Sequence, residues 1–94
     1  MEIEFDPAKS ARNAALRGLP FERALDFDFA TAAIKIDDRR DYGQTRYVAV
    51  GYLDGRLHVL CFVTVANGMR VISLRKANKR EAHRHEKSLR RTPD

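Results

Sequence analysis

Hydrophobic and polar residues alternate at the start of the chain. Ile3 and Phe5 are separated by glutamates, which predicts a short strand with one face toward water. The pair Asp6-Pro7 is typical of a helix start, because aspartate is a good N-cap and proline suits the first helical position. This helix is expected to end near Arg17, where a glycine follows.

A second short helix is expected to open at Pro20. Phe21, Ala24 and Leu25 follow helical spacing in this segment. The chain then leaves the helix, and a short edge strand is expected around residues 34–37. A polar loop, DDRRDYG, separates this strand from the next hydrophobic segment.

Three strands with clear turn signals follow the loop. The segment RYVAVGYLD runs into Asp54-Gly55, which is a strong hairpin signal. The next segment, RLHVLCFVTV, is apolar on both faces and should be central in the sheet. Asn67-Gly68 is expected to close a second hairpin, and MRVISLR forms the third strand before a helix that begins near Ala77.

The expected element order is β-α-α-(β)-β-β-β-α. This order predicts an α+β fold in which two N-terminal helices pack on an antiparallel β-meander sheet, with a C-terminal helix after it. A chain of 94 residues is expected to form a single domain, 1–94. The lone Cys61 cannot form an internal disulfide and should be a small buried side chain. With no secretory signal or membrane span in the pattern, a cytoplasmic location is expected.

The positive charge is concentrated at the C-terminal end. The chain carries a formal net charge of +5, but residues 70 to 91 contain nine basic residues and only two acidic ones. Such a local concentration favours a polyanionic partner, since neutralising phosphates releases counterions. A charged helix that only keeps the protein soluble is the alternative interpretation.

Three separated stretches carry a family resemblance. They are FDPAKSARN…RGLPFERA, DRRDYGQTRYVAVG and RVISLRKANKRE. Together they resemble the BrnT family of type II toxins, which have a RelE-like fold, over a span from about Glu4 to His85. The last stretch is the most specific, because a strand ending in Ser-x-Arg-Lys-Ala before a Glu-containing helix has no general structural reason to recur.

The resemblance implies a small, metal-independent endoribonuclease toxin that arrests growth by cutting RNA. It implies no cofactor and no membrane, and a BrnA-like protein antitoxin that neutralises the toxin and binds operator DNA on behalf of the complex. The chain departs from the family pattern at Leu16 and Arg17, where many relatives have lysine and histidine. Gln44 stands where glutamate is usual, and His85 where tyrosine is common. A non-catalytic basic binding module of the same fold, which binds nucleic acid or an acidic protein, is therefore the alternative function.

Cleavage of RNA without a metal requires a base, an acid and cations that stabilise charge on phosphorus. Arg75 and Lys76 are predicted to clamp the phosphate, with Arg70 as a second candidate. Because Arg70 and Arg75 are an odd number of residues apart, their side chains should point to opposite faces unless a bulge or the strand's end re-aims one. A salt bridge to a neighbouring acidic residue is the alternative role of Arg70.

Glu81 and His85 are four residues apart and should be neighbours on the last helix. They could form an acid–base pair or an ordinary surface pair. His58 is expected to be a partly buried histidine in the central strand. No pair of cysteines or histidines has metal-ligand spacing, so no metal site is predicted. The predicted RNA-binding residues are Lys9, Asn13, Tyr42, Arg46, Lys79, Arg80 and Arg84.

Overall fold

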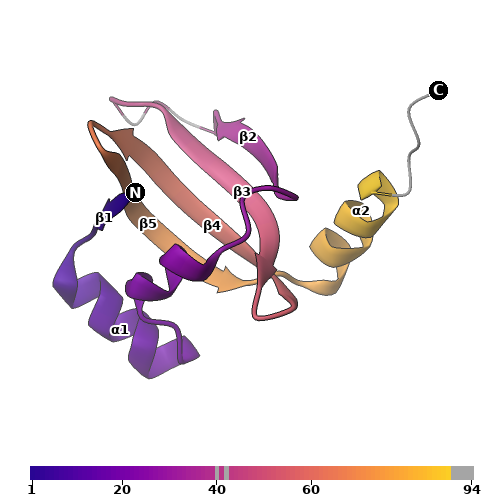
Figure 1. The fold of residues 1–94 in the computed structure, drawn as a ribbon, viewed down its shortest axis with the longest axis horizontal. Coiled ribbons are helices and arrows are strands. Elements are labelled where there is room, and N and C mark those ends of the chain that lie inside the picture. Colours follow the sequence, from indigo (N-terminus) through magenta and orange to yellow (C-terminus); the bar gives the residue numbers. More distant parts are fainter. Residues whose placement is uncertain (40, 42, 90–94) are drawn as a thin grey trace.

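The computed structural model describes residues 1–39, 41 and 43–89. Figure 1 shows one sheet with helices at both ends of the molecule. The elements, in chain order, are β1 (Glu2–Glu4), α1 (Pro7–Arg17), the 3-10 helix η1 (Phe21–Asp26), β2 (Ala33–Asp37), β3 (Arg46–Leu53), β4 (Arg56–Val65), β5 (Gly68–Lys76) and α2 (Lys79–Leu89). The predicted α+β class is confirmed, and every expected element lies within a few residues of its predicted place.

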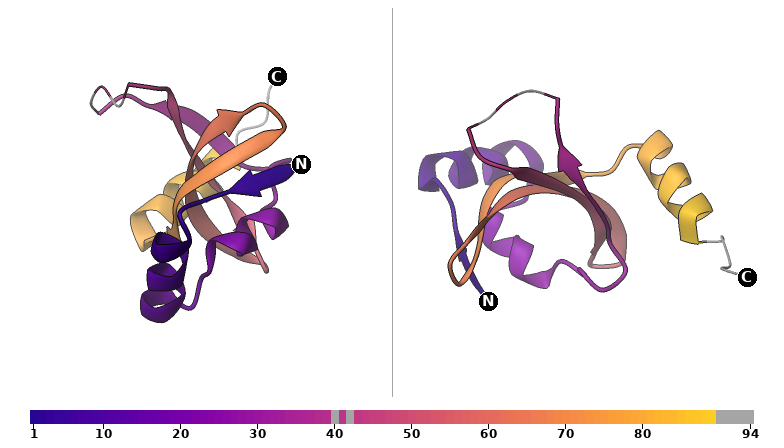
Figure 2. Two further views of the ribbon diagram at one scale, coloured as in Figure 1. Left: turned by 90° about the vertical axis from the view of Figure 1, so that its left-hand side faces the viewer. Right: turned by 90° about the horizontal axis from the view of Figure 1, so that it is seen from above.

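The sheet has five strands in the order β1-β5-β4-β3-β2. The strands β2 to β5 pair antiparallel with their neighbours in sequence, whereas β1 pairs parallel with β5. The sequence had suggested an antiparallel sheet. The parallel pairing of β1 with β5 makes the sheet mixed instead. β4 is central, and Leu57 to Val63 are all buried, in agreement with its apolar sequence. Figure 2 shows the twist of the sheet from two further sides.

The second predicted helix is a 3-10 helix of six residues, which is longer than the roughly three or four residues usual for this type of helix. Its first and last i→i+3 hydrogen bonds join Arg23 to the carbonyl of Pro20, and Phe27 to that of Ala24. The buried side chains Phe21, Ala24 and Phe27 pack on one face of the sheet and form the core with Leu60, Leu74 and others.

α1 is attached to this layer through polar side chains. Its buried residue is Ser10, whose hydroxyl accepts a hydrogen bond from the backbone N–H of Phe21 at 2.9 Å. The Asn13 amide donates to the carbonyls of Leu19 (2.7 Å) and Leu74 (2.8 Å). These contacts fix α1 against η1 and β5 without a large apolar face.

The two hairpin turns differ in how they use glycine. Asp54 and Gly55 both have positive φ, as a two-residue type I′ hairpin turn requires, and the first prediction is confirmed. In the second hairpin the turn residues are Ala66 and Asn67, and Gly68 already belongs to β5. A Cβ at Gly68 would lie 1.7 Å from the carbonyl oxygen of Glu2, so glycine is needed here for the close approach of β1.

A bulge interrupts the pairing of β4 with β5. Cys61 faces Ser73 and Phe62 faces Val71, which leaves Ile72 without an opposite residue. Side chains that point into the core are Met69 and Val71 before the bulge and Leu74 after it. The bulge therefore inverts the alternation of faces along the rest of β5.

α2 lies beyond the end of β5, at the opposite end of the molecule from α1 (Figure 1). Its inward-facing His85 contacts the ring of Tyr52 edge-on, with ring centroids 5.8 Å apart. α2 therefore approaches the sheet from the face opposite to the core. Within the described residues, no helix is both long and apolar enough to cross a membrane.

Candidate functional site

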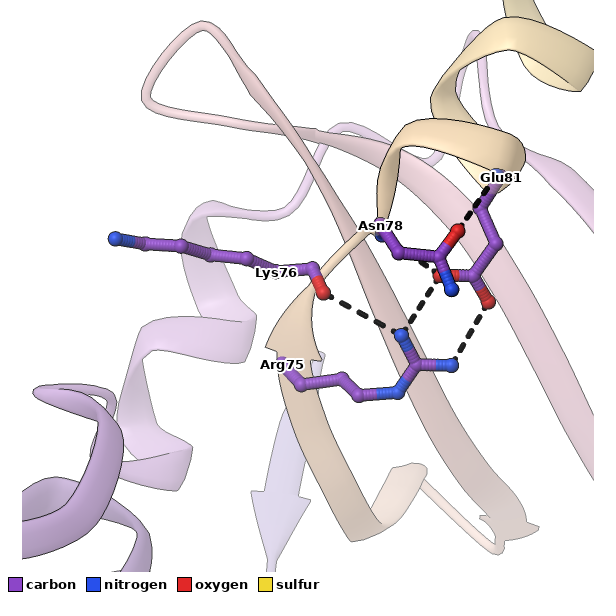
Figure 3. A network of polar contacts seen from close by, with 4 residues as sticks. All are labelled: Arg75, Lys76, Asn78 and Glu81. Carbon is purple, nitrogen blue, oxygen red and sulfur yellow. Dashed lines mark hydrogen bonds and ion pairs between the residues drawn. The ribbon is translucent and has the colours of Figure 1, made fainter.

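A network of polar contacts joins the end of β5 to the start of α2 (Figure 3). The Arg75 guanidinium donates from Nη1 and Nη2 to the two carboxylate oxygens of Glu81, both at 2.8 Å. Glu81 also accepts from the backbone N–H of Asn78, whose side-chain oxygen accepts from the backbone N–H of Glu81. This reciprocal capping box begins α2, and Arg75 ties it to the sheet.

These contacts fix the charge states of both partners. Hydrogen bonding to Arg75 lowers the pKa of Glu81 from 4.5 to about 2, and the Asn78 backbone contributes to the lowering. The same hydrogen bond raises the pKa of Arg75 above its usual value. Glu81 is thus a carboxylate throughout the neutral range and is not suited to act as a general acid.

Arg70 and Arg75 lie on the same face of the sheet, opposite the core. The sequence predicts opposite faces unless a bulge re-aims one residue, and this exception applies, because the bulge at Ile72 inverts the alternation between them. Arg70 nevertheless forms an ion pair with Glu4 of β1, with Nη2 and Oε1 2.9 Å apart. The alternative interpretation of Arg70, a salt bridge to a neighbouring strand, is confirmed.

Lys76 follows Arg75 in sequence, but the two side chains point in different directions. Its side chain extends away from the Arg75 guanidinium (Figure 3), and only its backbone carbonyl accepts from Arg75, at 3.3 Å. The Lys76 side chain lines a hollow on the other side of the strand, together with Arg56 and the buried His58. The predicted clamp of Arg75 with Lys76 on one phosphate is therefore not assembled, because successive residues of a strand point to opposite faces.

A long groove lies on the face of the sheet that carries Arg75, and we call it the arginine groove. Its volume is about 730 Å³. Its basic side chains come from α1, β2, β3, β5 and the segment after β2, and they are Arg17, Lys35, Arg39, Arg46 and Arg75. Three acidic residues also line it, namely Asp37, Asp38 and Glu81.

The floor of the groove consists of small side chains from the middle strands, among them Val59 and Cys61. Cys61 is buried, as predicted, and burial raises the pKa of its thiol. Asp37 is 2% exposed and accepts two hydrogen bonds from Arg39, each 2.8 Å long. The lining of the groove thus combines uncharged side chains such as Val59 and Cys61 with five basic and three acidic residues.

A second hollow, which we call the α2 pocket, adjoins the arginine groove and has a volume of about 260 Å³. The two share the side chains of Lys35, Val48 and Glu81. The remaining side chains of the α2 pocket are Ala33, Ile34 and Val50 from the sheet and Arg84, His85 and Ser88 from α2.

His85 is 4% exposed, and neither ring nitrogen has a hydrogen-bond partner among the described residues. Glu81 and His85 line the same pocket, as their spacing predicted. However, the Glu81 carboxylate accepts hydrogen bonds from Arg75 and Asn78. Within the described part of the chain, neither Glu81 nor any other carboxylate is hydrogen-bonded to His85.

The other predicted RNA-binding residues are dispersed. Lys9 and Arg46 line a hollow beside Arg70, and Arg46 also lines the arginine groove. Asn13 is engaged by two backbone carbonyls and holds the fold together instead of facing a ligand. Lys79 and Arg80 are exposed in the first turn of α2, and Arg84 lines the α2 pocket. Tyr42 lies outside the described residues.

Several groove residues were not predicted from the sequence. Lys35, Asp37, Val48 and Cys61 reach the site because β2, β3 and β4 lie side by side, with Asp37 paired to Arg46 and Lys35 to Val48. The alternation of Lys35 and Asp37 with isoleucines was a signal that one face of β2 is polar. No group of three or more His, Cys, Asp or Glu side chains in the described ranges is arranged to hold a metal ion.

Comparison with protein-family models decides the family. The model described as "Ribonuclease toxin, BrnT, of type II toxin-antitoxin system" matches residues 5–81. The chain belongs to the BrnT family. The BrnT match includes the strand arginines and ends at Glu81, so Arg84, His85 and Ser88 of the α2 pocket lie beyond it. Type II toxins act with a protein antitoxin, and such a partner is implied for this chain. No curated protein matched the chain.

Proposed function

We propose that this protein is a metal-independent endoribonuclease toxin that cuts RNA in the arginine groove and acts inside the cell. The observation that carries the proposal is the convergence of basic side chains from distant segments, among them Arg46 and Arg75, on one face of the sheet in a chain of the BrnT family. Such a rim suits the phosphates of a single RNA strand.

The proposed reaction is attack of the ribose 2′-oxygen on the adjacent phosphorus. The 2′-hydroxyl gives up its proton, the bond to the 5′-oxygen breaks, and a 2′,3′-cyclic phosphate and a 5′-hydroxyl result. Arg75 and Arg46 would stabilise the additional charge on the phosphoryl oxygens. His85 would transfer protons, since its ring can turn toward a substrate without losing a hydrogen bond to the described residues.

The Arg75–Glu81 pair supports a positioning role for Glu81. With both oxygens bound to Arg75, the carboxylate fixes the plane of the guanidinium at the border of the groove and the α2 pocket. Arg75 retains N–H groups that the carboxylate does not use, and a phosphate could accept these without breaking the pair. Glu81 would then orient the arginine rather than exchange protons.

A non-catalytic binding module remains a second candidate, and one observation favours it. Glu81, expected as half of an acid–base pair, is held by Arg75 with its pKa near 2. Without Glu81, proton transfer rests on His85, which lines the α2 pocket beside the groove. This second candidate predicts RNA binding that depends on the same arginines but leaves the RNA intact.

The test is incubation of purified protein with a single-stranded RNA in EDTA. We expect cleavage with 2′,3′-cyclic phosphate ends, and a loss of about 10²-fold or more in rate for Arg75→Ala. Because this change also leaves Glu81 unpaired, the double variant Arg75→Ala/Glu81→Gln separates loss of the arginine from the effect of the free carboxylate. Arg12→Ala, on the exposed side of α1, is the matched control.

Two results would contradict parts of the proposal. Intact RNA with wild-type protein, together with tight binding that weakens as salt rises, would leave the binding module as the function. Cleavage that stops in EDTA and returns with a divalent metal would refute metal independence while retaining the ribonuclease.

The proposed partner is a BrnA-like antitoxin that covers the arginine groove and carries the operator-DNA contacts of the complex. The mainly basic rim favours a partner with an acidic segment. Co-expression with the adjacent short gene, if it encodes the antitoxin, should restore growth and yield a co-purifying complex. RNA that binds equally well to the free protein and to this complex would show that the antitoxin covers a different surface.

A further inference from the structure

The α2 pocket has the features of a ligand site. Of its side chains the proposed cleavage chemistry uses only Glu81 and His85, which leaves its apolar wall, Arg84 and Ser88 without a role. Its sheet side is mainly apolar, with Ala33, Val48 and Val50 beside the one cation Lys35. Its helix side is polar, with Arg84 and Ser88. An apolar surface with a few convergent polar groups is the usual composition of a small-molecule site. The pocket also contains a buried imidazole, His85, whose two nitrogens lack partners among the described residues.

Buried polar groups without a partner are rare, because each costs the free energy of its lost hydrogen bonds. For His85 a ligand in the pocket would remove that cost. The ring can rotate to meet it, since no hydrogen bond to the described residues holds the ring in place.

Size and position limit the class of ligand. A volume of about 260 Å³ lies just below the range of about 300–1,000 Å³ typical of small-molecule sites, so one ring system fits and a large ligand does not. The pocket adjoins the arginine groove, with which it shares the side chains Lys35, Val48 and Glu81. A ligand here would therefore lie beside a phosphate bound in the groove.

We infer that the α2 pocket binds a nucleobase of the RNA strand and sets the base preference of cleavage. The base would lie on Val48 and Val50, and Arg84 and Ser88 would meet its polar edge, while His85 would meet the attached ribose, where the proposed proton transfer takes place. Single-stranded RNA is usually read in this way, by unstacked bases that enter pockets beside a phosphate contact. This inference rests on the proposed function and adds a specificity site to it.

Binding can be tested without cleavage. The four 3′-mononucleotides and inorganic phosphate are titrated into the full chain, and backbone amide signals are followed by NMR. We expect nucleotides to shift the amides of Ala33, Val48 and Val50, with affinities that differ between bases, and inorganic phosphate to shift only arginine-groove signals. Nucleotides that behave like phosphate, or pocket signals that respond to an antitoxin but to no nucleotide, would overturn the inference.

Arg84 and Ser88 line the pocket but are exposed, so their variants test the pocket without changing the packing of the core. Arg84→Ala and Ser88→Ala should each weaken nucleotide binding about three- to tenfold, the effect of one hydrogen bond, and flatten the base preference of cleavage. Lys87→Ala, on the same helix but outside the pocket, is the control and should change neither. If both variants cut RNA with unchanged base preference, the base pocket is refuted and the ribonuclease function stands. If the wild-type protein cuts no RNA, the proposed function is refuted, and the nucleotide titration decides whether the pocket binds a base.

Discussion

Replacing Glu81 by glutamine tests the contact that joins α2 to the sheet. Glutamine can still accept the N–H of Asn78, so the capping box survives, but the charge that pairs with Arg75 is lost. In the native protein the pKa of Glu81 is about 2, against an ordinary 4.5. Since the folded pKa is lowered, the carboxylate contributes stability above pH 4.5, and that stability is lost as the pH falls through 2.

The magnitude follows from the size of this pKa change. A shift from 4.5 to about 2 corresponds to an upper limit of about 3 kcal/mol, at about 1.36 kcal/mol per pKa unit. The Arg75 and Glu81 side chains are 37% and 24% exposed, and solvent screens a pair of this kind. We therefore expect Glu81→Gln to reduce the free energy of unfolding by about 1–2 kcal/mol at pH 7.

The assay is urea unfolding followed by circular dichroism, from pH 7 down to pH 2. The stability difference between wild type and Glu81→Gln should be constant down to about pH 5 and disappear near pH 2. Glu86→Gln removes an exposed carboxylate from the same helix and is the control for net charge. A difference that is equal at pH 7 and pH 2, or that matches the Glu86 control, would refute the role of the ion pair.

Three further outcomes follow from the fold. Asn13→Asp replaces a donor to two backbone carbonyls by a repelling charge, so urea unfolding should show that the free energy of unfolding falls by about 2–3 kcal/mol. Arg12→Ala, at the exposed neighbouring position, should change it by no more than about 0.5 kcal/mol. Equal effects of the two variants would contradict this role of Asn13. Gly68→Ala places a Cβ against the backbone of Glu2, and hydrogen exchange should show β1 detached from β5; a protected β1 would refute the close approach. Cys61 is buried and its thiol pKa is raised, so a thiol reagent at pH 7 should label it slowly in the native protein and quickly in urea; rapid native labelling would contradict its burial.

The sequence by itself determined the elements, because their signals are local. Asp6-Pro7 starts α1, Asp54-Gly55 forms the first hairpin turn, and the uniformly apolar segment around Cys61 identifies the central strand. The three stretches that resemble the BrnT family were also readable without coordinates, and the family-model match confirms the family that they indicated.

Only the tertiary structure decided which side chains meet. Period-2 alternation placed Arg70 and Arg75 on opposite faces, but one unpaired residue, Ile72, reverses every face after it. No local signal in the sequence marks that bulge, because it arises from the register of β5 against β4.

The same reasoning explains the rest of the candidate site. Lys35 and Asp37 reach the arginine groove because β2 pairs with β3, and the Arg75–Glu81 pair forms because α2 folds back at the end of β5. Strand pairing and helix docking join residues that are distant in the chain, and their free energy depends on the whole packed arrangement rather than on neighbours in sequence. The sequence could therefore supply the chemical groups of this protein, while their grouping into a groove and a pocket required the fold.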